Sequence, residues 1–195
     1  SNEAFSAVGS VTPIINILIG LFSGLATGTG AVISQYYGAK QEDRVREAVH
    51  SAIFVTFLLG ALSTIIAIVA APWMLRLMKM PENVFPHALT YLRIYFAGTI
   101  ANLFFNVGSG ILRAVGDSKS PLYVLIFCTV LNIALDVLFV AVLGLATAGA
   151  AIATILSQAC SALLVLILVH RKGDAFHIHL KEIKLHPDLL MHIFR

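Results

Sequence analysis

The stretch PLYVLIFCTVLNIALDVLFVAVL, residues 121–143, decides the fold of this chain. As a helix it is long enough to cross a hydrocarbon core of about 30 Å, which takes roughly 20 mostly apolar residues. One carboxamide, Asn132, and one carboxylate, Asp136, interrupt the apolar run. The stretch therefore predicts a membrane-spanning helix, and it raises the question of what an acid does inside it.

The composition of the whole chain agrees with a membrane protein. Hydrophobic residues make up 58% of the sequence, charged residues make up 12%, and the mean hydropathy is +0.90. Soluble domains contain about twice that share of charge. We expect an all-α fold, a polytopic transmembrane helix bundle without a soluble domain. Its five expected spans are residues 11–36, 47–71, 87–112, 121–143 and 147–169.

Short, turn-rich links separate the spans, so consecutive spans are expected to run antiparallel. Ten of the 13 Lys and Arg residues lie in the segments that follow the first, third and fifth spans. Because cytoplasmic loops collect positive charge, the chain is predicted to start outside and end in the cytoplasm. The expected location is the cell membrane, as a multi-pass protein of a bacterial or archaeal inner membrane.

The two ends of the sequence suggest a piece of a larger bundle. Residues 1–10 contain neither an initiator Met nor a signal peptide, although the chain is predicted to start outside. We therefore expect residues 1–172 to form part of a transmembrane lobe. Residues 173–195 are expected to form a cytoplasmic linker and the start of a further helix. His177 and His179 in this tail have no partner ligands at metal-site spacing, so a metal site there is disfavoured.

Charge and cysteine content exclude several other functions. The net charge of +3 and the pI near 9.0 reflect cytoplasmic loops that face anionic lipid headgroups, and they need no nucleic-acid partner. Cys128 and Cys160 fall in mid-span and are interpreted as small packing residues. No nucleophile triad, phosphate loop, HExxH or CxxC motif occurs in the sequence. We predict no enzyme and no cofactor.

Asp136 is the main candidate for function. An ionised Asp at the centre of a lipid-facing helix costs about 2.5 to 3.5 kcal/mol, so the side chain should face the bundle interior or a wet cavity. Burial favours the protonated carboxyl, whereas a bound cation favours the carboxylate. Such a group can exchange a proton for a metal ion, and this exchange is the chemistry of ion coupling.

Three further polar residues are expected at the depth of Asp136. Asn132 lies one helical turn away on the same face, and Thr154 on the fifth span reaches about the same depth. Tyr91 lies in the outer half of the third span. Carboxylate, amide and hydroxyl oxygens suit Na⁺, so Asp136, Asn132 and Thr154 form a possible sodium site. The alternative for Asn132 and Thr154 is polar contact between helices.

Other polar and small residues are interpreted as structural. Asn102 and Asn106 in the third span are expected to join helices. A stripe of small residues in the first span is expected to let another helix approach closely, and it could also permit bending. Its members are Gly20, Gly24 and Gly28.

The segment after the third span, GILRAVGD, residues 110–117, is expected to have a structural or gating role. Gly116 suits the end of a helix, and Arg113 and Asp117 are expected to pair at the membrane surface.

Four segments together resemble the multidrug and toxic compound extrusion (MATE) transporters. They are LATGTGAVISQYYGAKQEDRVREAV (25–49), GILRAVGDSKSP (110–121), LNIALDVLF (131–139) and GAAIATILSQ (149–158). Their order and spacing are similar to those of spans two to six of that family, over nearly the whole chain. The resemblance implies a twelve-helix transporter of two six-helix lobes, of which this chain is the N-terminal lobe without its first helix.

The resemblance also implies an activity: the export of organic, often cationic compounds in exchange for Na⁺ or H⁺. Asn132, Asp136 and Thr154 match the family's polar coupling site, and Tyr91 matches a tyrosine beside it. The family's acidic residue on the first helix is absent here. The missing helix and the C-terminal lobe would be partners of this chain, together with small-molecule drugs and membrane lipid.

Two alternatives remain open at the level of sequence. A lipid-linked oligosaccharide flippase of the same superfamily would place several basic residues in its cavity, but these spans contain almost no Lys or Arg. A non-transporting membrane scaffold subunit would not depend on Asp136. Replacing this residue with Asn therefore separates the scaffold from the exporter.

Overall fold

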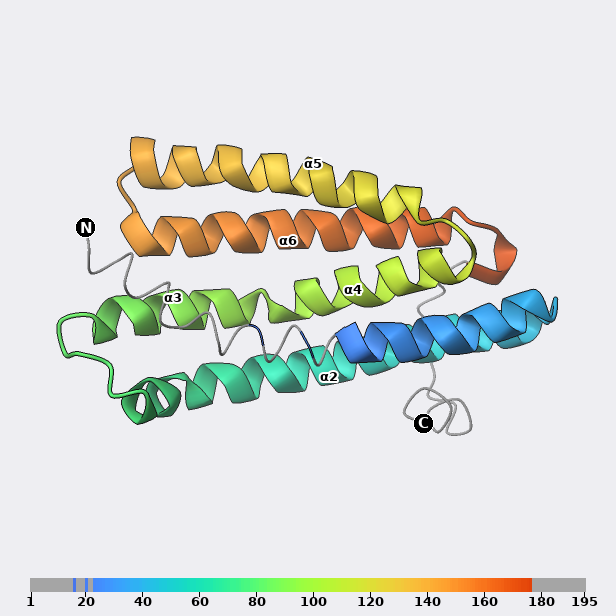
Figure 1. Ribbon diagram of the computed structural model, residues 1–195, viewed down its shortest axis with the longest axis horizontal. Coiled ribbons are helices and arrows are strands. Elements are labelled where there is room, and N and C mark those ends of the chain that lie inside the picture. The colour runs from blue at the N-terminus through green and yellow to red at the C-terminus, as the bar shows by residue number, and fades with distance from the viewer. Residues whose placement is uncertain (1–15, 17–19, 21–22, 177–195) are drawn as a thin grey trace.

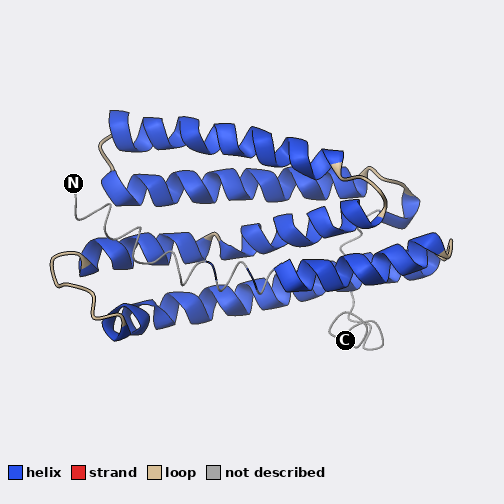
Figure 2. Ribbon diagram, in the orientation of Figure 1, coloured by secondary structure: helices blue, strands red, loops and turns tan. Residues whose placement is uncertain are grey.

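The computed structural model describes residues 16, 20 and 23–176, and this part of the chain is a bundle of helices (Figure 1). Figure 2 shows helices joined by short loops, with no strand in the described part. Residues 23–38 form the described part of the first helix. The elements that follow are α2 (Glu42–Leu77), α3 (Phe85–Ala97), α4 (Thr99–Ala114), α5 (Lys119–Asp136), the π-helical segment η1 (Val137–Val142), α6 (Ala146–His170) and the short 3-10 helix η2 (Asp174–Phe176).

Length and apolar composition identify the membrane spans. Within the described residues, α2, α5 continued through η1, and α6 are each long and apolar enough to cross a membrane, and α3 with α4 makes a fourth candidate. The expected all-α transmembrane bundle is confirmed. Much of the first expected span, 11–36, lies outside the described residues, which include only its helical portion from residue 23 onward.

The third span is not the single straight helix expected over residues 87–112. It consists of α3 and α4, which bend by 42° at the break between them. Gly98 lies at this break, and a Cβ there would be 2.7 Å from Cγ1 of Ile155 and 3.1 Å from Oε1 of Gln158. Glycine therefore allows the junction of α3 and α4 to lie close against α6.

Helix α6 is at the centre of the described bundle. It packs against α3, α4 and α5, while α2 packs against α3 and α4. In Figure 1, α6 lies between α5 and the α3–α4 pair. One apolar cluster includes Val49, Leu103 and Val165, and a second includes Leu92 and Ala151. In contrast, only 11% of the most apolar window of α5–η1 is buried, so most of that span faces outward.

Small residues allow the first described helix to approach α4. A Cβ at Gly110 would lie 2.6 Å from the carbonyl oxygen of Ala26, and a Cβ at Gly30 would lie 3.2 Å from the carbonyl oxygen of Gly110. In lipid there is little hydrophobic driving force for helices to associate. Close packing of backbones is therefore a main source of stability in membranes.

The glycine stripe that was expected to let another helix approach is not the site of this contact. A Cβ at Gly20 or Gly24 would meet nothing within 4 Å among the described residues, and Gly24 is exposed. Gly28 is half-buried. The contact with α4 lies on another face of the helix, which carries Ala26 and Gly30. The approach of a helix to Gly20 and Gly24 therefore stays a prediction, because no described helix makes it.

Gly116 ends α4 as expected. Its φ is +83°, a backbone conformation that glycine adopts without steric cost. The amide of Gly116 donates to the carbonyl of Arg113 at 3.0 Å, and the amide of Asp117 donates to that of Leu112 at 2.9 Å. This pair of bonds is the Schellman motif, which satisfies two carbonyls at a helix end.

The expected pair between Arg113 and Asp117 is wrong. The Asp117 carboxylate pairs with the Lys172 ammonium, just beyond α6. It also accepts hydrogen bonds from the Ser120 amide at 3.0 Å and the Ser120 hydroxyl at 2.7 Å. These partners, Lys172 foremost, hold the pKa of Asp117 at about 2, below its ordinary value of 3.8.

The chain beyond α6 packs back onto the bundle before the described part ends. Phe176, at the end of η2, is only 4% exposed, and its ring centroid lies 6.1 Å from that of Tyr37. The linker and further helix expected over 173–195, and the pair His177 and His179, lie almost entirely outside the described residues.

Candidate functional site

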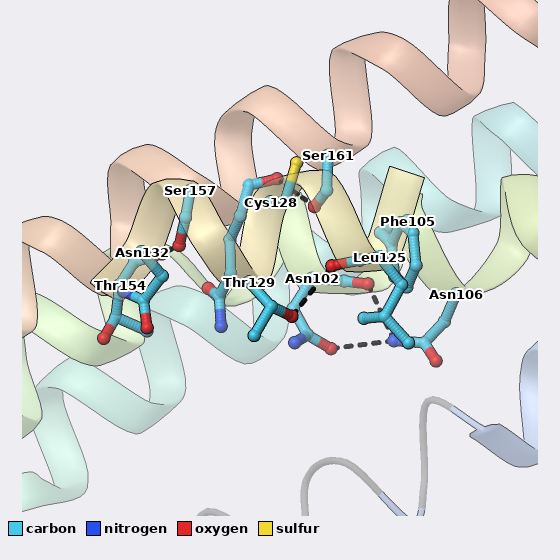
Figure 3. A pocket seen from close by; sticks show the side chains of 11 residues that line it. Asn102, Phe105, Asn106, Leu125, Cys128, Thr129, Asn132, Thr154, Ser157 and Ser161 are labelled. Atoms are coloured by element: carbon cyan, nitrogen blue, oxygen red, sulfur yellow. Dashed lines mark hydrogen bonds between the residues drawn. The ribbon is translucent and has the colours of Figure 1, made fainter. Parts of the chain in front are cut away.

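A pocket of about 340 Å³ opens between α4, α5 and α6 (Figure 3). The described residues that line it carry carboxamides, hydroxyls, one thiol and two apolar side chains, and none of them is charged. The lining residues are Asn102, Phe105, Asn106, Leu125, Cys128, Thr129, Asn132, Thr154, Ser157, Gln158 and Ser161. The pocket is therefore polar but uncharged, inside the part of the bundle that spans the membrane.

Helical periodicity builds this lining. On α5 and α6 the lining positions follow the spacing i, i+3, i+4 and i+7, which places them along one face of a helix. On α4 the spacing is i, i+3 and i+4. Each of the three helices thus contributes one stripe, and the stripes converge on the pocket.

Every hydroxyl in the lining is already bonded to its own helix. Thr129 donates to the carbonyl of Leu125 at 2.8 Å, and Thr154 donates to that of Ala150 at 2.9 Å. Ser157 donates to the carbonyl of Thr154 at 2.9 Å, and Ser161 donates to that of Gln158 at 2.8 Å. The hydroxyl hydrogens are therefore committed to bonds within the helices, and only the oxygen lone pairs are available to accept a hydrogen bond from a ligand.

The carboxamides differ in how well they are satisfied. Nδ2 of Asn106 donates to both the backbone oxygen and the side-chain oxygen of Asn102, each at 2.8 Å. The Gln158 side chain lies close to the Tyr95 hydroxyl, and its Oε1 is buried without a hydrogen-bond partner. Nδ2 of Asn132 is also buried without a partner. Buried polar atoms are nearly always bonded, so these two orphans indicate a site that a ligand or water completes.

Asp136 lies just beyond this pocket. It is the last residue of α5, one turn from Asn132, and one of its carboxylate oxygens, Oδ1, is buried without a hydrogen-bond partner. Its carboxylate is within electrostatic reach of Tyr91, on α3. The structure thus divides the four predicted residues in two. Asn132 and Thr154 line the pocket, whereas Asp136 and Tyr91 do not belong to its lining.

The backbone changes directly after Asp136. Residues 137–142 form a π-helix, and the amide of Leu143 donates to the carbonyl of Leu138 at 3.0 Å, five residues earlier. π-Helical turns are rare and occur often at functional sites. The sequence suggested an uninterrupted helix here, because apolar residues carry no signal for the wider turn.

The predicted sodium ligands are hard oxygen donors, and two of the three are neutral. The described part of the chain contains no group of three or more His, Cys, Asp or Glu residues placed to hold a metal. The predicted sodium ligands Asp136, Asn132 and Thr154 offer one carboxylate, one carboxamide oxygen and one hydroxyl oxygen. This set suits an alkali cation better than a transition metal.

Sequence reasoning missed about half of the lining. It singled out Asn132 and Thr154 and treated Asn102 and Asn106 as structural. It did not identify Thr129, Ser157, Gln158 and Ser161. The missed signal was the helical spacing of polar residues along α5 and α6. The sequence shows the spacing of each stripe but not that the two stripes face the same pocket.

Comparisons with known proteins agree with this architecture. The family model MatE matches residues 1–138. The chain is 33% identical over 200 residues to the Bacillus subtilis (strain 168) protein named "Probable multidrug resistance protein YoeA", covering 99% of this chain and 43% of that protein.

Two solved structures are also similar. A crystal structure of MATE in the bent conformation matches with a TM-score of 0.93 and 30% identity, over 100% of this chain and 44% of that one. An inward-facing multidrug resistance MATE family transporter of the MOP superfamily matches with a TM-score of 0.91 and 30% identity, over 98% of this chain and 44% of that one. The chain thus spans less than half the length of the proteins it matches.

Proposed function

Because the chain belongs to the MatE family, we propose that the protein it represents is a secondary active exporter of small organic compounds, driven by exchange for Na⁺ or H⁺. In this proposal the pocket between α4, α5 and α6 binds the exported compound, and Asp136 binds the coupling ion. The multidrug names of a relative and of a solved structure support the first part.

One observation carries the second part: the buried Oδ1 of Asp136 has no partner. An ionised oxygen in a site of low dielectric needs a proton, a cation or a donor to offset the cost of desolvation. None of the described residues provides one. A bound proton or sodium ion would offset this cost. A coupling site requires this ability to bind an ion.

Geometry connects the two sites. Asn132 lies in the pocket lining, and Asp136 lies one turn later on the same helix, immediately before the π-helix. Loss or gain of a charge at Asp136 would change how the end of α5 packs, and the same movement would shift Asn132 in the pocket. In this mechanism Thr154 and Asn132 are neutral ligands or hydrogen-bond partners. Tyr91, which lies within electrostatic reach of the carboxylate, acts as a lid over it.

The proposed orientation places the end of α6 in the cytoplasm, as the distribution of Lys and Arg predicts. The exported compound would then be released on the side of the α5–α6 connection, at the end of the bundle where Asp136 lies.

Transport in vesicles tests the proposal. The full protein is reconstituted, and export of a fluorescent organic cation is recorded under an imposed Na⁺ gradient and under an imposed H⁺ gradient. We expect one gradient to drive export in wild type and Asp136→Asn to abolish the response. Asp43→Asn, an exposed acid in the first turn of α2, is the matched control and should transport normally. Gradient-driven export that survives Asp136→Asn would place the coupling site elsewhere.

The alternatives make different predictions. A lipid-linked oligosaccharide flippase must bind phosphate groups, and the described pocket contains no Lys or Arg in its lining. A scaffold subunit predicts that Asp136→Asn leaves export untouched in cells that express the variant at wild-type levels.

A further inference from the structure

The hydrogen-bonding character of the pocket points to a preference among cations. The four lining hydroxyls all donate to carbonyls of their own helices. A hydroxyl has one hydrogen and two lone pairs, so each of them can only accept a further hydrogen bond. The lining therefore presents these hydroxyls to a ligand as acceptors.

The carboxamides increase this imbalance. Nδ2 of Asn106 is committed to Asn102, so the remaining function of the Asn106 side chain is its oxygen. Oε1 of Gln158 is an unused, buried acceptor. The donors left in the lining are the side-chain amide nitrogens of Asn102, Asn132 and Gln158 and the weak thiol donor of Cys128. Free acceptors outnumber free donors on an uncharged wall.

We propose that this pocket selects ligands that carry N–H donors, above all protonated amines, and discriminates against quaternary ammonium compounds of the same size. The proposal rests on the proposed export function and specifies its substrate class. A protonated amine offers N–H groups to the hydroxyl and carboxamide oxygens. A quaternary ammonium offers none, and it would leave these oxygens desolvated and unpaired.

The lining offers no compensating way to hold a quaternary cation. Recognition of quaternary ammonium groups uses cages of several aromatic faces. Among the described residues that line the pocket, Phe105 is the one aromatic side chain, and none is a carboxylate. The difference between the two cation types must therefore come from hydrogen bonds, and those favour the amine.

A matched pair of ligands tests this preference. One dye carries a primary ammonium group, and the second is the same dye with that nitrogen trimethylated. Equilibrium binding of both to the detergent-solubilised full protein is measured by fluorescence, and export of both is measured in vesicles. Wild type should bind the primary ammonium dye about tenfold or more tightly than its trimethylated form.

Lining variants identify the source of the preference. Ser157→Ala and Thr129→Val remove one acceptor oxygen each, and the carbonyls they release keep their helical hydrogen bonds. Each should weaken binding of the primary ammonium dye by about three- to tenfold and leave the trimethylated dye unchanged. Ser34→Ala and Thr27→Val are matched controls, because both hydroxyls make the same kind of bond at exposed positions outside the pocket.

The outcomes separate the two proposals. Equal or tighter binding of the trimethylated dye overturns the selectivity, and so do lining variants that weaken both dyes alike or neither. Export of both dyes at equal rates with equal affinities would overturn the selectivity and leave the exporter proposal standing. Failure of wild-type vesicles to export either dye would overturn the exporter proposal itself.

Discussion

The carboxylate of Asp117 pairs with the ammonium of Lys172, which ties the loop between α4 and α5 to the residue just beyond α6. Their side chains are 14% and 34% exposed, so water only partly screens the pair. The same carboxylate receives two hydrogen bonds from Ser120 at the start of α5. One acid thus joins three helix ends.

This arrangement predicts a pH dependence of stability. The pKa of Asp117 is lowered in the folded protein from 3.8 to about 2, so its contribution is fully present above pH 3.8 and is lost as pH falls toward 2. Asp117→Asn should lower the free energy of unfolding by about 1 kcal/mol at neutral pH, and the difference from wild type should vanish over that window. Thermal unfolding in detergent from pH 2 to 7 measures this.

The control for Asp117 is a pair on the surface. Arg44 and Glu47 form an ion pair at 3.0 Å with side chains 54% and 36% exposed. Glu47→Gln should change stability by less than about 0.5 kcal/mol, because exposed pairs contribute little. Equal losses for Asp117→Asn and Glu47→Gln would contradict a structural role for the Asp117 pair.

The contact between the first described helix and α4 predicts a contrast between two glycines. Gly110→Ala would place a Cβ 2.6 Å from the backbone oxygen of Ala26, which cannot move without shifting a helix. It should cost about 1 to 3 kcal/mol. Gly24→Ala meets nothing within 4 Å and should be neutral or slightly stabilising. Melting temperatures of the two variants in the same detergent decide between this contact and the Gly24 stripe.

A third prediction concerns the interaction between the Tyr95 hydroxyl and the Gln158 side chain. Tyr95→Phe removes the hydroxyl that lies close to this side chain, whose Oε1 is already buried without a partner. The loss should be about 1 kcal/mol of stability. Tyr123→Phe is the control, since Tyr123 is 66% exposed on α5 and should have little effect. A Tyr95→Phe protein as stable as the control would show that this interaction contributes nothing.

The fourth prediction tests whether the Thr154 hydroxyl binds the coupling ion or only lines the pocket. Its hydroxyl donates within α6, so Thr154→Val should fold normally. If the oxygen is a ligand of the coupling ion, the variant needs a higher ion concentration for half-maximal export, by about three- to tenfold, with little change at saturation. An unchanged ion dependence would assign Thr154 to the pocket alone.

The sequence by itself determined the class of this protein and most of its spans. The length of an apolar run is a property of one segment alone, because a helix in lipid forms all its backbone hydrogen bonds within itself. The spans α2, α5 and α6 could therefore be predicted from the sequence. The C-cap at Gly116 is equally local, because it depends on one left-handed residue. Asp136 stood out because an acid is costly anywhere in an apolar span.

Tertiary structure decided what depends on the other helices. The bend at Gly98 depends on Ile155 and Gln158 across the interface. The choice of Lys172 over Arg113 as the partner of Asp117 depends on where α6 ends. The pocket exists because polar stripes on three helices converge, and the sequence shows each stripe but not which way it faces. The physical reason is that the bend, the ion pair and the pocket all depend on contacts between segments that are far apart in the chain.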